Sequence, residues 1–117
     1  MQDTLTNVVR AYFGAYENEN REVAETLLSD DFTFTSPNDD AIDKATYFER
    51  CWPDHDARRA QDIENIFVEG DKAFVTYRCA TANGKSFRNT EFLTFRGERI
   101  SSVNVYFGAA YQDGVFV

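Results

Sequence analysis

Glu91 is the residue of this chain whose type and setting most clearly allow chemistry. It lies in the stretch 87–95, whose aromatic and β-branched residues between turn signals predict a β-strand. The two-residue period of a strand places Glu91 on one face with Asn89 and Leu93. A carboxylate on an apolar face is costly unless it is paired, protonated or facing a wet cavity. Held neutral, Glu91 could donate a hydrogen bond to a developing oxyanion; paired with Arg78, it would stay charged and lose that role.

Tyr12 and His55 are the other two candidates for catalysis. Tyr12 lies four residues before Tyr16 on the buried face of a predicted helix over about residues 4–18. There it is either a tyrosine of the core or one whose hydroxyl lines a site. His55 stands between two aspartates in a charged loop. It is either a solvated histidine or a general base at the mouth of a pocket.

Metal and cofactor sites are not expected. The two cysteines, Cys51 and Cys79, lack a CxxC spacing, and the chain has a single histidine. We therefore interpret both cysteines as reduced structural residues and expect no metal and no cofactor.

The elements that must position these residues can be read from spacing and turn chemistry. After the first helix, Asn20 is a predicted N-cap of a second helix, and Asp43 of a third. The remaining predicted elements are a strand over 32–36 closed by Pro37, a polar loop over 38–40, and from residue 63 a four-stranded meander with turns at 69–71, 83–84 and 96–98.

The meander also predicts a register. A two-residue turn at 83–84 would place Thr76 opposite Glu91 and Arg78 opposite Asn89, and a three-residue loop at 96–98 would place Val103 opposite Glu91. One face would then hold Phe74, Thr76, Arg78, Asn89, Glu91, Leu93, Val103, Val105 and Phe107. The other face, with Val75, Tyr77, Cys79, Thr90, Phe92 and Tyr106, is also apolar, which predicts a homodimer packed through it.

Composition narrows the class of protein. The chain has 117 residues and is expected to form one domain over 1–117. Its net charge of −8 argues against nucleic acid and against an anionic membrane surface as partners. No apolar run is long enough for a membrane span, and the N-terminus does not read as a signal peptide, so a cytoplasmic protein is expected.

The order and spacing of four stretches, 8–12, 27–37, 88–92 and 103–108, resemble the nuclear transport factor 2-like superfamily. Within it, the chain is most similar to the branch of SnoaL-like polyketide cyclases and ketosteroid isomerases. The resemblance implies an α+β fold, in which a cone-shaped, curved antiparallel sheet (a half-barrel) wraps around N-terminal helices and opens into an apolar pocket.

The resemblance also implies roles for single residues. In the ketosteroid isomerases a tyrosine of the first helix and a protonated acid of a late strand form an oxyanion hole, and a carboxylate before a proline moves the proton. Tyr12 and Glu91 fall at the first two positions, but Ser36 stands where that carboxylate is expected. A serine hydroxyl has no useful basicity near pH 7, so steroid isomerisation by the family mechanism is not expected. His55 with a neighbouring aspartate is a loose counterpart of the His–Asp pair of some cyclase relatives.

These observations predict a pocket for a small apolar ligand that carries a ring or a carbonyl group. The residues expected to line it are Tyr16, Phe34, Ser36, Phe48, Trp52, Arg78, Asn89, Val103, Val105 and Phe107. Any chemistry would be a cofactor-free isomerisation, cyclisation or dehydration through an enolate, carried by Tyr12, Glu91 and His55. The alternatives are a non-catalytic ligand-binding domain and a dimeric interaction module of the same fold with a filled cone.

Overall fold

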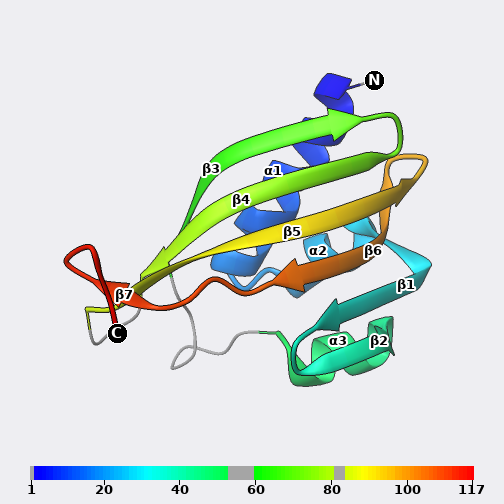
Figure 1. Ribbon diagram of the computed structural model, residues 1–117. Coiled ribbons are helices and arrows are strands. Elements are labelled where there is room, and N and C mark those ends of the chain that lie inside the picture. The colour runs from blue at the N-terminus through cyan, green and yellow to red at the C-terminus, as the bar shows by residue number, and fades with distance from the viewer. Residues whose placement is uncertain (1, 53–59, 81–83) are drawn as a thin grey trace.

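Three helices cover one face of a curved sheet in the computed structural model, which describes residues 2–52, 60–80 and 84–117 (Figure 1). The helices are α1 (Gln2–Glu17), α2 (Arg21–Leu27) and α3 (Lys44–Arg50). The strands are β1 (Leu28–Ser36), β2 (Asp39–Asp43), β3 (Ala60–Glu69), β4 (Lys72–Ala80), β5 (Ser86–Arg96), β6 (Arg99–Tyr106), β7 (Tyr111–Gln112) and β8 (Val115–Phe116). This is the predicted α+β cone. No helix in these ranges is long and apolar enough to cross a membrane.

Both predicted helix caps are confirmed. The Asn20 side chain accepts a hydrogen bond from the Val23 backbone N–H at 3.3 Å, and the Asp43 side chain accepts one from the Thr46 N–H at 2.9 Å. These bonds satisfy backbone donors that the first turn of a helix leaves free. Asp43 thereby fixes the start of α3, the helix that carries Tyr47.

The sheet is mixed rather than purely antiparallel, which corrects the prediction. Its strands follow the order β2-β1-β6-β5-β4-β3, with β1 and β6 parallel and the other neighbours on this path antiparallel. The predicted polar loop at 38–40 is also wrong, because β2 begins at Asp39 and forms a hairpin with β1. In that hairpin Ser36 and Asp39 are paired, so the two side chains lie close together.

The predicted register of β4 against β5 is wrong by one residue. Val75, not Thr76, is opposite Glu91, and Tyr77, not Arg78, is opposite Asn89, because the last pair before the connection is Ala80 with Ser86. A slip of one residue exchanges the two faces of a strand. Tyr77 and Cys79 therefore point to the helix side, and Arg78 points to the outer face.

The register of β5 against β6 differs from the prediction by two residues, which keeps the faces. Glu91 is opposite Val105 rather than Val103, because Arg96 pairs directly with Arg99 and a bulge follows at Thr94 and Phe95. Val103 and Val105 both stay on the face of Glu91.

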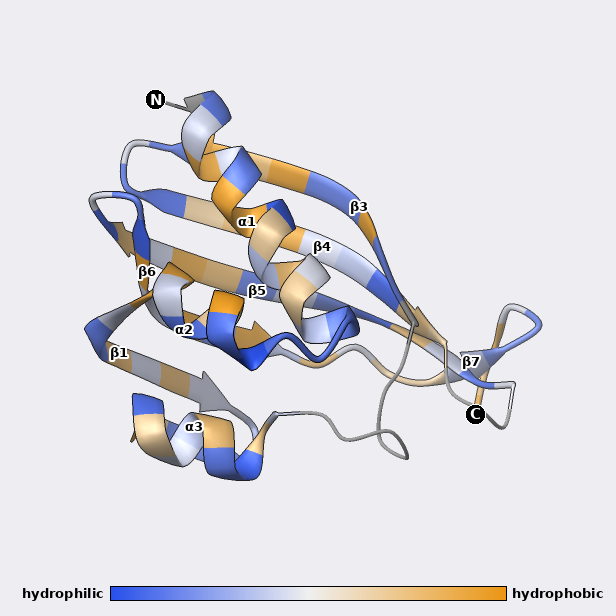
Figure 2. Ribbon diagram, turned by 180° about the vertical axis from the view of Figure 1, so that it is seen from behind, coloured by the Kyte–Doolittle hydropathy of each residue, from blue (hydrophilic) through white to orange (hydrophobic). Residues whose placement is uncertain are grey.

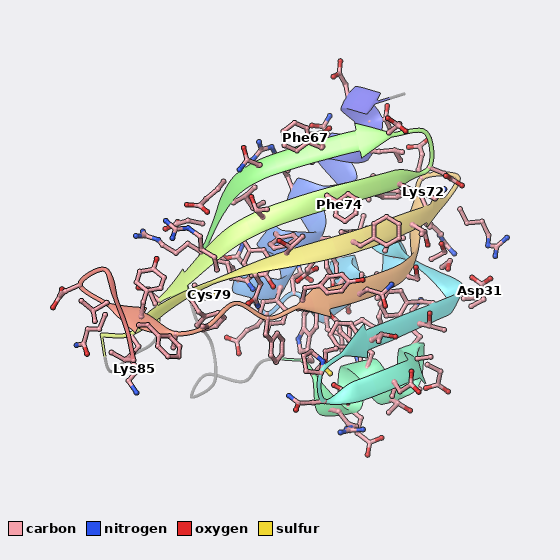
Figure 3. All side chains as sticks on the ribbon, in the orientation of Figure 1. Asp31, Phe67, Lys72, Phe74, Cys79 and Lys85 are labelled. Carbon is pink, nitrogen blue, oxygen red and sulfur yellow. The ribbon has the colours of Figure 1, made fainter. Side chains whose placement is uncertain are left out.

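The hydrophobic core lies between the helices and the sheet. Val9 of α1, Leu28 of β1, Val75 of β4 and Leu93 of β5 are completely buried there. Figure 2 shows α1 and α2 lying across the strands and α3 beside β1. The opposite face of the sheet carries large aromatic residues, among them Phe67 and Phe74, which Figure 3 shows on the neighbouring strands β3 and β4.

Candidate functional site

A cavity of about 550 Å³ lies between α1, α3 and the inner face of the sheet. This volume is within the range of small-molecule sites in proteins. Aromatic rings and polar side chains share its wall. Its main polar residues are Tyr12, Tyr16, Ser36, Asp39, Tyr47, Arg50, Gln61, Tyr77, Asn89 and Glu91.

Glu91 is the buried acid of this cavity, with 7% of its surface exposed. Its Oε2 accepts a hydrogen bond from the Tyr77 hydroxyl at 2.6 Å, whereas its Oε1 is buried and has no partner among the described residues. Burial disfavours the charged carboxylate and raises the pKa of Glu91 to about 7, although the Tyr77 hydrogen bond acts in the opposite direction. The neutral and charged forms of Glu91 are therefore both accessible near neutral pH.

The Tyr77 hydroxyl is itself held in place. Asn89 donates from Nδ2 to the Tyr77 oxygen at 3.2 Å, and the Asn89 Oδ1 accepts from the backbone N–H of Gly108 at 3.1 Å. The polar groups on this side of the cavity thus form one connected chain of hydrogen bonds that ends at Glu91.

Tyr12 and Tyr47 form a second polar group of the cavity. Their hydroxyl oxygens are 2.5 Å apart, with Tyr12 on α1 and Tyr47 on α3. Burial raises the pKa of both phenols, and the nearby Glu91 carboxylate raises them further, so both stay neutral. Two hydroxyls that share one hydrogen bond have a second hydrogen left for a ligand.

Asp39 is the third polar feature, and its side chain is 7% exposed. The Arg50 guanidinium lies 3.0 Å from Oδ1, and Oδ2 accepts from the Ser36 hydroxyl at 3.2 Å. The Cys51 thiol lies 3.7 Å from the same Oδ2, and burial raises the pKa of that thiol to about 11. Within the described ranges no three His, Cys, Asp or Glu side chains are grouped so that they could hold a metal ion.

A model of the SnoaL-like domain matches residues 9–103 of the chain. This range includes Glu91, the Tyr12–Tyr47 pair and Asp39. The chain belongs to the SnoaL-like domain family. No curated protein matches it.

Solved structures agree with this SnoaL-like domain in fold. A ketosteroid isomerase candidate from Kribbella flavida superposes with a TM-score of 0.79 at 19% identity, over 94% of this chain and 82% of that one. A candidate SnoaL-like polyketide cyclase from Jannaschia sp. CCS1 gives 0.77 at 15% identity, over 90% and 85%. An LEH-like epoxide hydrolase from M. tuberculosis gives 0.75 at 19% identity, over 90% and 83%. At such low identity these likenesses show the fold, and the activities belong to those proteins.

The structure brings most of the sequence-predicted site residues of this SnoaL-like domain to one cavity. Its wall includes Tyr12, Tyr16, Phe34, Ser36, Asn89, Glu91, Val105 and Phe107. Phe48, Trp52 and Val103 lie outside the wall: the Phe48 and Trp52 rings pack on each other with centroids 5.1 Å apart, and Val103 is a buried core residue.

Two predicted residues have other outcomes. Arg78 lies on the outer face, where its Nη2 is 3.1 Å from Asp62 Oδ2. Its predicted place in the pocket wall is therefore wrong, and the alternative in which it pairs with Glu91 is excluded. The slipped register of β4 is the physical reason. His55 lies outside the described residues.

Sequence reasoning missed Tyr47, Tyr77 and Asp39. Tyr47 precedes the recognised Phe48 by one residue and could have been found from the 3.6-residue period of α3. Tyr77 was assigned to the wrong face by the register. The sequence predicts Asp39 in a polar loop, and only its pairing with Ser36 in the hairpin brings it to the cavity.

Proposed function

We propose that this SnoaL-like domain binds a small apolar carbonyl compound and catalyses proton transfer on it without a cofactor, as an isomerase, cyclase or dehydratase. The observation that carries the proposal is the buried Glu91, whose Oε1 has no partner in the part of the chain that the structure describes. It lies in the wall of a ring-lined cavity that also holds the Tyr12–Tyr47 pair. Groups with shifted pKa values that converge on a cavity are the usual mark of acid–base chemistry.

The donors of the cavity would stabilise an enolate. Neutral Glu91 and the free hydrogen of the tyrosine pair would both donate to the carbonyl oxygen, where negative charge develops as a neighbouring C–H bond breaks. The phenols stay neutral because burial raises their pKa values, so they act as donors throughout. Their low-dielectric setting strengthens these bonds relative to water.

Asp39 is the carboxylate of the cavity wall that could take the proton. The electron pair of the broken C–H bond would move toward the carbonyl oxygen, and Asp39 would return the proton to another carbon in an isomerisation. In the resemblance Ser36 stands at the carboxylate position, and here the Ser36 hydroxyl donates to Asp39 across the β1–β2 hairpin. His55 remains a predicted alternative for this role.

Asp39→Asn is expected to abolish turnover of a β,γ-unsaturated cyclic ketone, measured as growth of conjugated-enone absorbance, while binding of the saturated ketone persists. The amide keeps the size of the side chain but cannot accept the proton. Turnover at the wild-type rate by Asp39→Asn would contradict the role of Asp39.

A non-catalytic binder is the second candidate, favoured by the three contacts that already engage the Asp39 oxygens. Wild-type protein that binds the saturated ketone without turning over any unsaturated one would support it. Protein that binds neither would instead favour an interaction module.

We also propose a homodimer through the outer face of the sheet. Phe67, Phe74 and Phe92 are cross-strand neighbours on three adjacent strands, and the Phe74 and Phe92 ring centroids are 4.8 Å apart. Phe67 is 70% exposed and Phe74 50% exposed in the single chain, an apolar row that a second copy would cover.

Phe74→Asp is expected to convert a dimer into a monomer, because it places a charge at the centre of this aromatic row. Light scattering after size-exclusion chromatography measures the change. Val23→Asp, at an exposed apolar position of α2, serves as the matched control and should leave the mass unchanged. A monomeric wild type, or a dimer that tolerates Phe74→Asp, would contradict this interface.

A further inference from the structure

The hydrogen bonds that reach Glu91 have a fixed direction. The Gly108 backbone N–H can only donate, so it takes the carbonyl oxygen of the Asn89 side chain at 3.1 Å. The Asn89 NH₂ group then faces the Tyr77 oxygen at 3.2 Å and donates to it. The single hydroxyl hydrogen of Tyr77 is left for Glu91 Oε2 at 2.6 Å. Each orientation follows from the one before, beginning at a backbone amide that cannot be reversed.

This direction decides which oxygen of Glu91 carries a proton. Oε2 accepts from Tyr77, and the carbonyl oxygen of a neutral carboxyl group is a stronger acceptor than its hydroxyl oxygen, so this bond favours Oε2 as the carbonyl oxygen. The proton of the neutral acid is then favoured on Oε1, which has no partner among the described residues. A buried donor without a partner is strongly disposed to bond an acceptor on a ligand.

The identity of residue 108 is part of the same arrangement. A Cβ at Gly108 would overlap the backbone oxygen of Arg88, so no other residue fits without moving the chain. Gly108 follows β6, and this close approach is what brings its N–H within reach of Asn89.

We propose that Tyr77, Asn89 and Gly108 are positioning residues that assign the proton of Glu91 to Oε1, so that the cavity selects ligands with an acceptor-only oxygen, such as a ketone or an epoxide, over the matching alcohols. The inference rests on the proposed function in one respect, namely that Glu91 meets the ligand. An alcohol that accepts from Glu91 brings one hydrogen more than a ketone does. Either that hydrogen or the free hydrogen of the Tyr12–Tyr47 pair would then lack an acceptor.

Other titratable or charged groups face the same cavity. They are Tyr12 and Tyr16 from α1, Tyr47, Arg50 and Cys51 from α3 and its C-terminal end, Asp39 from β2, and Tyr77 and Cys79 from β4. Raised pKa values keep the phenols of Tyr12, Tyr47 and Tyr77 neutral, and Arg50 is ion-paired with Asp39. A titration near pH 7 in this cavity is therefore expected from Glu91.

The first test is a carbon-13 NMR titration of the Glu91 carboxyl in the full chain. Tyr77→Phe removes a donor to the charged form, so the titration is expected to move to higher pH. Gly108→Ala is expected to move it in the same direction, because Asn89 loses its anchor and competes for the Tyr77 hydrogen. Gly14→Ala, where an added Cβ meets nothing within 4 Å, is the matched control and should leave the titration unchanged.

The second test compares α-tetralone with α-tetralol by calorimetry. At pH 5.5 the wild type should bind the ketone roughly tenfold more tightly, the factor that one unmade hydrogen bond of about 1.4 kcal/mol gives. At pH 8.5, where charged Glu91 can accept, the preference should vanish or reverse. Tyr77→Phe should narrow the preference at pH 5.5, because Oε2 becomes free to accept from the alcohol.

The outcomes separate this inference from the proposed function. Titrations of Tyr77→Phe and Gly108→Ala that stay at the wild-type pH, or move lower, would overturn the positioning role whatever the ligand does. Equal affinity of the wild type for α-tetralone and α-tetralol at pH 5.5 would overturn the proposed selectivity for the ketone. If the wild type binds neither probe, the ligand role of Glu91 is overturned. The NMR titrations alone then decide whether Tyr77, Asn89 and Gly108 position the proton.

Discussion

Glu91→Gln is expected to make the protein more stable than wild type at pH 8 by about 3 kcal/mol, with most of that difference gone at pH 5. Burial raises the pKa of Glu91 from 4.5 to about 7, and each pKa unit corresponds to about 1.4 kcal/mol. The folded state holds the proton more tightly than the unfolded state. The resulting stabilisation is therefore complete below pH 4.5 and is lost as pH rises through about 7. Glutamine resembles the neutral acid at every pH and has no such loss.

Urea unfolding of both proteins between pH 4.5 and pH 8.5 measures this difference. Glu98→Gln, the same substitution at an exposed turn position, controls for the loss of one charge. Parallel stability curves for wild type and Glu91→Gln would show that Glu91 is not a desolvated acid in the folded protein.

Tyr12→Phe is expected to lower kcat for the unsaturated ketone by about 10²- to 10³-fold, the usual effect of removing one oxyanion donor. The Tyr12 and Tyr47 hydroxyls share one hydrogen bond of 2.5 Å, so removing either leaves a single hydroxyl that the other no longer orients. Because the two act as a unit, Tyr47→Phe and the double variant should lose activity by similar factors rather than multiplied ones.

Steady-state kinetics of the three variants tests this, with Tyr106→Phe as a control on the exposed outer face. An unchanged kcat of Tyr12→Phe would show that the tyrosine pair has a structural role in the core and no role in catalysis. Losses that multiply in the double variant would show two independent donors instead of a pair.

The sequence was sufficient to predict the fold because its strongest signals are local. Asn20 and Asp43 were recognisable as caps from residue type and position, and both make the expected bond. The turn at Gly70 and Asp71 was equally readable, since Glu69 pairs directly with Lys72. Local chemistry of this kind needs no knowledge of the rest of the chain.

The wall of the cavity was less predictable, because it depends on register and topology. The alternation of β4 does not show which set of residues faces inward when both sets are apolar. Only the pairing of Ala80 with Ser86 turns Tyr77 toward Glu91 and Arg78 away from it. That single slip removes the Arg78 alternative and gives Glu91 a neutral hydroxyl donor, Tyr77.

Asp39 and Tyr47 illustrate the same limit over longer distances. Asp39 reaches the cavity through a hairpin that three consecutive polar residues conceal in the sequence. Tyr47 meets Tyr12 across 35 positions of chain, a contact that neither helix encodes alone. The acid Glu91 could be found in advance because a buried-face carboxylate is conspicuous in one strand.

The most direct test of Glu91 as a neutral acid of the cavity is its carboxyl pKa in the wild-type protein, measured by carbon-13 NMR with Glu91→Gln to assign the signal. We expect a pKa near 7, as for a desolvated acid with one oxygen that has no partner within residues 2–52, 60–80 and 84–117. A pKa at or below the ordinary 4.5 would mean a charged, stabilised carboxylate, and would contradict both the proposed chemistry and the positioning of its proton.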